Sequence, residues 1–380
     1  MALTPVPPTP PAQIPHPPAG HLLPSVEFPP QSLLPSQFDM TVNGLHPESE
    51  LFEKLSNASG SLPTWIRDPM YNHIIKKVNN YIFKSAPAGA PLPEEPNSWK
   101  FSVVGDMGNG TKSQADVAAN LLSYHPELVL TVGDNVYPNS QPKNWQQHFD
   151  PPELMGNILN SAPVLPCLGN HDIDPNPDEY FMRFPWLKGS RYYSADYKNI
   201  HVVALDTNDS LAPGSVQAAW LEHDLATTKQ PWKIVEFHHP MMSVISKFHY
   251  KSTSKLPEFL GPMLAKHAVD LVLVGHEHWY ERSKPLNDAG TIQITDGGGG
   301  GALYPFPYPQ QAWSATRDID FGHVNFEVRG DNELVGRYVK RDGSVGDTFV
   351  LNHGGHAPVP APAGALAPAP VPAPAPAPAP

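Results

Sequence analysis

Cysteine is almost absent from this chain: among its 380 residues only Cys167 carries a thiol. An intrachain disulfide needs two cysteines and a cysteine-based zinc cluster needs several, so both are excluded. Cys167 lies in an apolar run typical of a buried strand, where a cysteine packs as a small hydrophobic side chain. We therefore expect this thiol to be structural rather than catalytic.

Long apolar stretches and the pattern of a secretory signal peptide are lacking as well. No apolar run approaches the ~18 residues of a membrane-spanning helix, so no membrane span is expected. The first residues lack the basic start and the continuous apolar core of a secretory signal peptide. The composition by itself therefore indicates neither a cellular compartment nor an oligomeric state.

Basic residues are outnumbered by acidic ones. The chain has 25 Lys and Arg against 37 Asp and Glu, which gives a formal net charge of −12. This charge argues against a nucleic acid or an anionic membrane as the main partner, because both would be repelled. It does not exclude a small anionic substrate, since bound metal ions would be the largest local charges in a site.

Proline, in contrast, is abundant, and many of the 48 prolines lie near the two ends of the chain. We expect residues 1–98 to form a proline-rich strap with a helical arm between residues 47 and 84. The strap is either a linker over the domain surface or a docking motif for a partner. Residues 353–380 are expected to be a disordered or polyproline-like Ala-Pro tail. The remaining residues, 99–352, have the composition of a globular domain.

Apolar runs alternate with amphipathic helical patterns through this central domain. Five runs predict buried strands: Phe101–Val104, Leu128–Val132, Val164–Leu168, Ile234–Phe237 and Leu271–Val274. Later segments have the alternation and short turns of antiparallel strands: Thr291–Thr295, Gly322–Val328, Glu333–Val339 and Thr348–Leu351. The pattern predicts an α/β domain with two mixed sheets flanked by helices.

A short polar segment ends or follows each of the five buried strands. These segments are Gly105-Asp106-Met107-Gly108, Gly133-Asp134-Asn135-Val136-Tyr137, Gly169-Asn170-His171-Asp172, Val235-Glu236-Phe237-His238 and Gly275-His276-Glu277-His278. Ligands of open α/β sheets bind just beyond the carboxyl ends of the strands, so we expect the segments to converge on one site. Their Asp, Asn, His and Tyr side chains predict a metal centre.

Two metal ions suit this set of donors. One carboxylate can bridge two cations, and Asp134 is the best candidate because Tyr137 follows three residues later. Asn170 adds a neutral oxygen, and His238 and His276 add imidazole nitrogens. Such mixed oxygen and nitrogen ligands favour Fe, Zn or Mn over Ca. Two ions about 3.5–4 Å apart would clamp a phosphoryl oxygen and activate water for attack.

The glycine run that follows Asp296, Gly297–Gly301, invites comparison with a phosphate-binding loop. It does not open a helix with Gly-Lys-Ser or Gly-Lys-Thr, so it is not a P-loop. We expect these glycines to let the backbone pass close to the metal site.

The five polar segments together resemble the calcineurin-like metallophosphoesterase superfamily, and within it the purple acid phosphatases. Most of the superfamily carries Asp-x-His in the first segment, and this His binds the first metal. Here the third position is Gly108, which gives the Asp-x-Gly of purple acid phosphatases. That family replaces the lost His by a Tyr in Gly-Asp-x-x-Tyr, which here is Tyr137. Because the loss and its replacement occur together, the resemblance is specific.

The resemblance implies a four-layer α/β/β/α sandwich and assigns the metal ligands. Fe(III) would occupy the first site, bound by Asp106, Asp134, Tyr137 and His278. Fe, Zn or Mn would occupy the second site, bound by Asp134, Asn170, His238 and His276. The family also favours a secreted or periplasmic location.

The same resemblance implies an acid phosphatase that hydrolyses small phosphate monoesters, with metal-bound hydroxide attacking phosphorus in line. His171 would hydrogen-bond the substrate phosphate or the leaving group. His249 is a further candidate for phosphate contact, although it follows His238 by eleven residues where the family has nine or ten. Two alternatives stay open: a phosphodiesterase of the same superfamily acting on cyclic nucleotides or other diesters, and a non-catalytic binding protein on the same fold.

Overall fold

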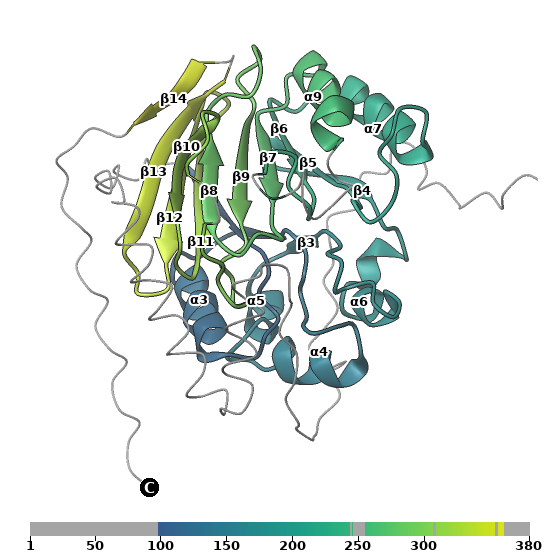
Figure 1. The fold of residues 1–380 in the computed structure, drawn as a ribbon, viewed down its shortest axis with the longest axis vertical. Helices are drawn as coiled ribbons and strands as arrows, with labels where there is room; N and C mark the ends of the chain where they lie inside the picture. Colours follow the sequence, from purple (N-terminus) through teal and green to yellow (C-terminus); the bar gives the residue numbers. More distant parts are fainter. Residues whose placement is uncertain (1–97, 244, 246–254, 307–308, 354–355, 361–380) are drawn as a thin grey trace, which may run out of the picture.

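The computed structural model describes residues 98–243, 245, 255–306, 309–353 and 356–360. Residues 1–97 of the predicted strap, with the helical arm, lie outside these residues, as do His249 and residues 361–380 of the predicted tail. Figure 1 shows the described part as two β-sheets with helices packed around them. Within the described ranges, no helix has the length and apolar character that a membrane crossing requires.

The first sheet has seven strands among the described residues, in the order β14-β13-β12-β11-β1-β2-β3. In this order they span His356–Pro360, Val345–Asn352, Glu333–Lys340, Gly322–Arg329, Trp99–Val104, Leu128–Thr131 and Val164–Pro166. Strands β1, β2 and β3 are parallel, and the strands from β11 to β14 pair antiparallel with their neighbours. The parallel strands are the first three that the apolar runs predict.

The second sheet also has seven described strands, in the order β10-β8-β9-β7-β6-β5-β4. They span Ser314–Asp318, Tyr280–Ser283, Ile292–Asp296, Leu271–Val274, Trp232–Glu236, Ile200–Ala204 and Tyr193–Tyr197. Thr291–Thr295 was expected to pair antiparallel with its neighbours. As β9 it does so with β8, but it pairs in parallel with β7, so the expectation is wrong for that neighbour. The reason is that β8 runs back across the sheet, so β9 enters it from the same end as β7.

The side chains of β7 alternate between two apolar cores. Leu271 and Leu273 belong to the main core, and Val272 and Val274 to a second core under the helices α7 and α9. These helices span Val216–Thr227 and Leu256–Lys266. The period of two along β7 therefore separates an inner face from a helix-covered face.

The two sheets contact each other through their inner faces. The ring of Tyr280 in β8 stacks on that of Tyr338 in β12, with centroids 4.1 Å apart. On the outer side of the first sheet, helix α3 (Lys112–Ser123) contributes Val117 and Leu121 to the main core and contacts β11. The layers are therefore helix, sheet, sheet and helix, which confirms the predicted α/β/β/α sandwich.

The shorter helices lie in the connections that lead to β3 and β4. Helices α4 (Pro142–His148) and α5 (Gly156–Ser161) precede β3, and α6 (Asp178–Arg183) and the 3-10 turn η2 (Pro185–Leu187) follow it. Trp220 of α7 is half-buried and packs beside Tyr192. The neighbouring Leu221 is fully buried.

The first sheet extends past the predicted domain boundary at residue 352. The backbone of β14 pairs with β13, so that Val359 lies opposite Val350 and Pro360 opposite Phe349. Proline is tolerated on an edge strand because its missing N–H weakens only one side of the ladder. The expected tail from residue 353 is therefore wrong for residues 356–360.

A buried histidine joins three elements at the far edge of the second sheet. Nε2 of His201 in β5 lies 2.9 Å from Asp224 Oδ2, and Nδ1 lies 2.6 Å from Asp196 Oδ1. Burial alone would lower the pKa of His201, but the two carboxylates raise it above its ordinary value. Because the folded pKa exceeds the unfolded one, this stabilisation is complete below the unfolded pKa of about 6.5. It is lost as the pH rises through the folded pKa.

We expect His201→Asn to be about 2 kcal/mol less stable than the wild type at acidic pH, because hydrogen bonds to a charged group are lost. The difference should shrink steadily toward alkaline pH. Urea unfolding of both proteins between about pH 5.5 and pH 9, a range that brackets histidine titration, measures it. A difference that stays constant over this range would contradict the assigned ion pairs.

Candidate metal centre

The seven predicted ligand residues converge at the carboxyl ends of β1, β2, β3, β6 and β7, and hydrogen bonds and close polar contacts connect them all into one network. They are Asp106, Asp134, Tyr137, Asn170, His238, His276 and His278. All are buried except Tyr137 and Asn170, which are half-buried. Side chains from distant parts of the chain therefore form a single polar site within an apolar fold.

Three of these residues form a first group. The hydroxyl of Tyr137 lies 3.0 Å from Asp106 Oδ1 and 2.9 Å from His278 Nε2. His278 Nε2 is itself 3.2 Å from Asp106 Oδ1. A phenol oxygen, a carboxylate oxygen and an imidazole nitrogen thus face one another.

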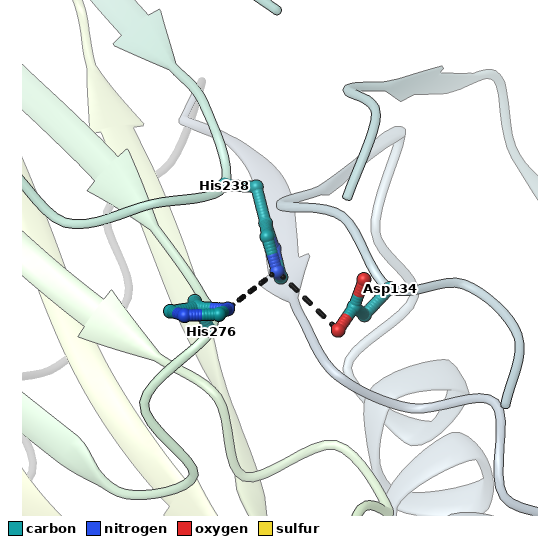
Figure 2. Close-up of side chains that lie close together, drawn as sticks. All are labelled: Asp134, His238 and His276. Carbon is teal, nitrogen blue, oxygen red and sulfur yellow. Dashed lines mark hydrogen bonds and ion pairs between the residues drawn. The ribbon is translucent and has the colours of Figure 1, made fainter. Parts of the chain in front are cut away.

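The other four residues form a second group around His238. Its Nε2 lies 3.1 Å from Asn170 Oδ1, 3.3 Å from Asp134 Oδ2 and 3.1 Å from His276 Nδ1. Figure 2 shows the His238 ring between the Asp134 carboxylate and the His276 ring. One ligand atom from each of these three residues lies within 4.8 Å of the others, so this triad can hold a metal ion.

The two groups are joined through the backbone, which is strained at the ligand positions. The N–H of His276 donates to Asp106 Oδ2 at 2.7 Å. Asp106, Asp134 and His276 have φ of 55°, 50° and 69°, in the left-handed region that non-glycine residues seldom adopt. Such strain typically clusters at functional sites, where the surrounding structure enforces it.

Two ligand rings are oriented by backbone carbonyls. Nδ1 of His238 donates to Val132 O at 2.9 Å, and Nδ1 of His278 donates to Ala302 O at 2.7 Å. A carbonyl can only accept, so both Nδ1 atoms carry the hydrogen and both Nε2 atoms face the site. This outer hydrogen bond is the usual arrangement of a metal-binding histidine.

Charges in the site depend on one another. Burial acts to raise the pKa of Asp134, but His238 and the neighbouring imidazoles hold it well below its ordinary value. Burial acts to lower the pKa of His238, but Asp134 raises it to about 9. Burial and the adjacent His239 and His238 keep the pKa of His276 well below its ordinary value. The buried carboxylate is therefore compensated by positive charge, which bound cations would also supply.

The donor spacing also fits a metal ion. Ligand atoms about 2.1 Å from one cation lie about 3.0–3.4 Å from each other at ordinary coordination angles. The three contacts of His238 Nε2, at 3.1, 3.3 and 3.1 Å, fall in this range. Since Nδ1 of His238 holds the ring hydrogen, a neutral His238 would point its Nε2 lone pair at the acceptor oxygens of Asn170 and Asp134. A cation between these atoms would relieve that repulsion.

The structure also explains why Gly108 and Tyr137 occur together. A Cβ at Gly108 would overlap the carbonyl oxygen of Asn135 and the Cα of Val136. Gly108 O accepts the N–H of Tyr137 at 2.6 Å. The turn that carries Tyr137 thus occupies the space that a side chain at position 108 would need.

The glycine run passes the site as expected. The N–H groups of Gly299 and Gly301 donate to the carbonyls of Gly105 and Asp106 at 2.9 and 2.7 Å. The run therefore lies against the first polar segment and supports its backbone.

Two histidines flank the ligands. His171 donates from its backbone to Asp134 Oδ1 at 2.9 Å and from Nδ1 to Pro138 O at 2.6 Å. Its Nε2 faces Asp134 Oδ2 at 3.8 Å. His239 interacts with Thr207 Oγ1 at 2.8 Å through Nδ1, and its ring lies 4.5 Å from that of His276.

Sequence reasoning missed the role of Asp172 in joining the second and third polar segments. Its carboxylate accepts from Asn135 N, Asn135 Nδ2 and Gly169 N at 2.9, 3.0 and 2.8 Å. Burial and the nearby Asp134 raise its pKa to about 7. Its position in the third segment, close to Gly169, was visible in the sequence, but Asn135 lies in the second segment and only folding brings it close.

Comparison with known families agrees with this site. The sequence model of the calcineurin-like phosphoesterases matches residues 100–280. That of the iron/zinc purple acid phosphatase-like protein C matches residues 290–348. The two matches are consecutive and together include every described residue of the site.

Curated relatives carry the same family name. Purple acid phosphatase 21 of Arabidopsis thaliana is 29% identical over 274 residues, which cover 66% of this chain and 60% of the relative. A protein called "Probable inactive purple acid phosphatase 1", of the same plant, is 27% identical over 327 residues, with 72% and 52% covered. This chain thus spans between half and two thirds of the length of these two relatives.

A solved structure shows the same fold. The purple acid phosphatase PPD1 from yellow lupin (Lupinus luteus) seeds superposes with a TM-score of 0.60 at 22% identity, covering 69% of this chain and 55% of the lupin chain. The fold, the polar site and the two family matches agree with one another. This chain is therefore a purple acid phosphatase-like member of the calcineurin-like phosphoesterase superfamily.

Proposed function

We propose that this protein hydrolyses small phosphate monoesters at a dinuclear metal centre built from the seven converging side chains. The observation that carries the proposal is their division into two contact groups, one around Asp106 and one around His238. Each group offers oxygen and nitrogen donors of the kind that Fe, Zn and Mn prefer.

The proposed ligand sets follow these groups. The first ion, Fe(III), would be held by Asp106, Tyr137 and His278, and the second, Fe, Zn or Mn, by Asn170, His238 and His276. Asp134 would be shared by the two ions, because its carboxylate has two oxygens, of which Oδ2 faces His238 Nε2 at 3.3 Å. When bound, two such ions polarise phosphoryl oxygens and lower the pKa of a coordinated water.

The chain itself orients the substrate and moves protons around this centre. Nδ1 of His171 is committed to Pro138 O, which leaves Nε2 as the ring atom on the side of Asp134. From there His171, when it also carries a proton on Nε2, hydrogen-bonds a phosphoryl oxygen or the leaving group and passes that Nε2 proton to the departing alkoxide oxygen, which leaves as the alcohol. His249, outside the described residues, is proposed as a second phosphate contact.

We expect p-nitrophenyl phosphate to be hydrolysed with a kcat/KM about 10–100-fold above that of bis(p-nitrophenyl) phosphate. The bis-ester lacks one anionic oxygen, and a hydrogen bond or ion contact to a charged oxygen contributes about 1.5–3 kcal/mol. Steady-state kinetics on the iron-reconstituted protein, with and without Zn or Mn, measures the ratio.

Two other results of these kinetic measurements would contradict the proposal, and each would indicate a different function. A ratio in favour of the bis-ester would identify a phosphodiesterase of the same superfamily. Absence of turnover in protein shown to hold two metal ions would identify a non-catalytic member, as the name of one Arabidopsis relative says of that protein.

A further inference from the structure

The backbone of Tyr137 is held from both sides by other segments. Its N–H donates to Gly108 O at 2.6 Å, and its carbonyl accepts from Nδ1 of His148 at 2.7 Å. A carbonyl oxygen can only accept, so Nδ1 of His148 carries the ring hydrogen. His148 ends α4, and the chain after Tyr137 therefore folds back onto the turn that carries the proposed ligand.

Gln114 connects His148 to the first polar segment. Its Nε2 donates to His148 O at 2.8 Å, and its Oε1 accepts from the N–H groups of Asn109 and Gly110 at 3.2 and 2.7 Å. In a capping box, a Gln at this position of α3 would return to the N-cap residue, Thr111. Here the buried side chain reaches further back along the chain instead, onto the loop that follows Asp106.

Gly110 provides the space that this arrangement needs. Its φ is +65°, and a Cβ there would overlap the ring of His148. The His148 ring thus lies directly on the loop that follows the first segment. Hydrogen bonds then form a closed circuit from Gly108 to Tyr137, His148 and Gln114 and back to the same loop.

We propose that Gln114 and His148 are positioning residues for the first metal site, which set where the Tyr137 hydroxyl lies relative to Asp106 and His278. The inference rests on the proposed function, because it concerns how Tyr137 meets Fe(III). The Tyr137 ring is rigid and packs 4.6 Å from the His171 ring, so a shift of its backbone moves the hydroxyl. The Gln114 side chain hydrogen-bonds the backbone of the loop after Asp106 and of His148 in α4. The His148 side chain hydrogen-bonds the backbone of Tyr137.

The test compares His148→Leu, which removes the donor, with His148→Asn, whose amide nitrogen can replace Nδ1. In Fe(III)-loaded protein, His148→Leu should lose iron to a chelator about 10–100-fold more readily, the usual effect of removing an outer partner of a ligand. Its visible tyrosinate-to-iron absorption band should shift or weaken. His148→Asn should retain both properties, and Gln114→Met should behave like His148→Leu.

The control is His201→Asn, which is expected to lower stability at a position removed from the metal centre and should change neither iron release nor the band. Unchanged iron release and an unchanged band in both His148→Leu and Gln114→Met would overturn the positioning role and leave the proposed function intact. So would equal changes in the His201→Asn control. A wild type that binds two iron ions without any visible band would instead overturn the ligation by Tyr137 itself. If His148→Leu does not fold, Gln114→Met carries the comparison.

Discussion

Asp134→Asn should lose bound metal and phosphatase activity together. Asp134 belongs to the donor group around His238 and is the proposed bridge to the first ion, and Asn offers one carbonyl oxygen where the carboxylate offers two charged ones. Loss of the bridge removes several kcal/mol of charge stabilisation from the reaction, which corresponds to a fall in kcat/KM of at least about 10³-fold. Metal analysis of protein purified without chelator, together with p-nitrophenyl phosphate turnover, measures both effects.

The matched control for this variant is Asp270→Asn. Asp270 accepts the N–H of Lys233 at 2.8 Å and precedes β7, so it lies at the opposite end of the sheet from the site. An amide oxygen can accept the same hydrogen bond, and this variant should keep its metal and its turnover. Full activity in Asp134→Asn, with two metal ions still bound, would show that the assignment of the bridging ligand is wrong.

Tyr137→Phe should abolish the colour of the Fe(III)-loaded protein. The visible band of such a centre arises from charge transfer between a tyrosinate and iron, and Phe cannot supply the phenolate. Burial and the neighbouring Asp106 raise the pKa of Tyr137 well above its ordinary value, so without a cation the hydroxyl stays protonated at neutral pH. The colour should therefore appear only as Fe(III) is added, which a titration followed by visible absorbance measures.

Tyr193→Phe provides the control, because Tyr193 is a buried tyrosine whose hydroxyl donates to Pro166 O in the main core. This variant should keep the band. The Phe at position 137 keeps the ring beside His171, so the expected loss of colour is specific to the hydroxyl. If Tyr137→Phe retained the band with iron bound, another group would have to be the chromophore.

The apolar runs predicted the strands that carry the site well. Leu271–Val274 forms β7 with the predicted bounds, and Leu128–Val132 forms β2 to within one residue. These strands are buried on both faces, so nearly every position must be apolar and the run is visible in the sequence. Sequence reasoning did not find β8 or β10, because Tyr280–Ser283 and Ser314–Asp318 are largely polar.

Contacts with the other sheet explain why the sequence pattern did not predict strand β8. Tyr280 and Arg282 both bond to Asp347 on the other sheet, at 2.8 and 2.7 Å. Their burial depends on a partner that is distant in the sequence, and no local pattern reports it. The strand β14 was not predicted either, and its backbone pairs with β13.

The chemistry of the site was predicted from the sequence: the resemblance to purple acid phosphatases implied that Tyr137 beside Gly108 replaces the usual histidine, and the residues themselves determined which donors follow which strands. Residue types and spacing suffice for this, because the carboxyl ends of parallel strands meet at one edge. Only the tertiary structure decided how the donors are held: the overlap that excludes a side chain at position 108, the carbonyls that orient His238 and His278, and the circuit through Gln114 and His148. These are contacts between segments far apart in the chain, and their geometry is set by packing rather than by local sequence.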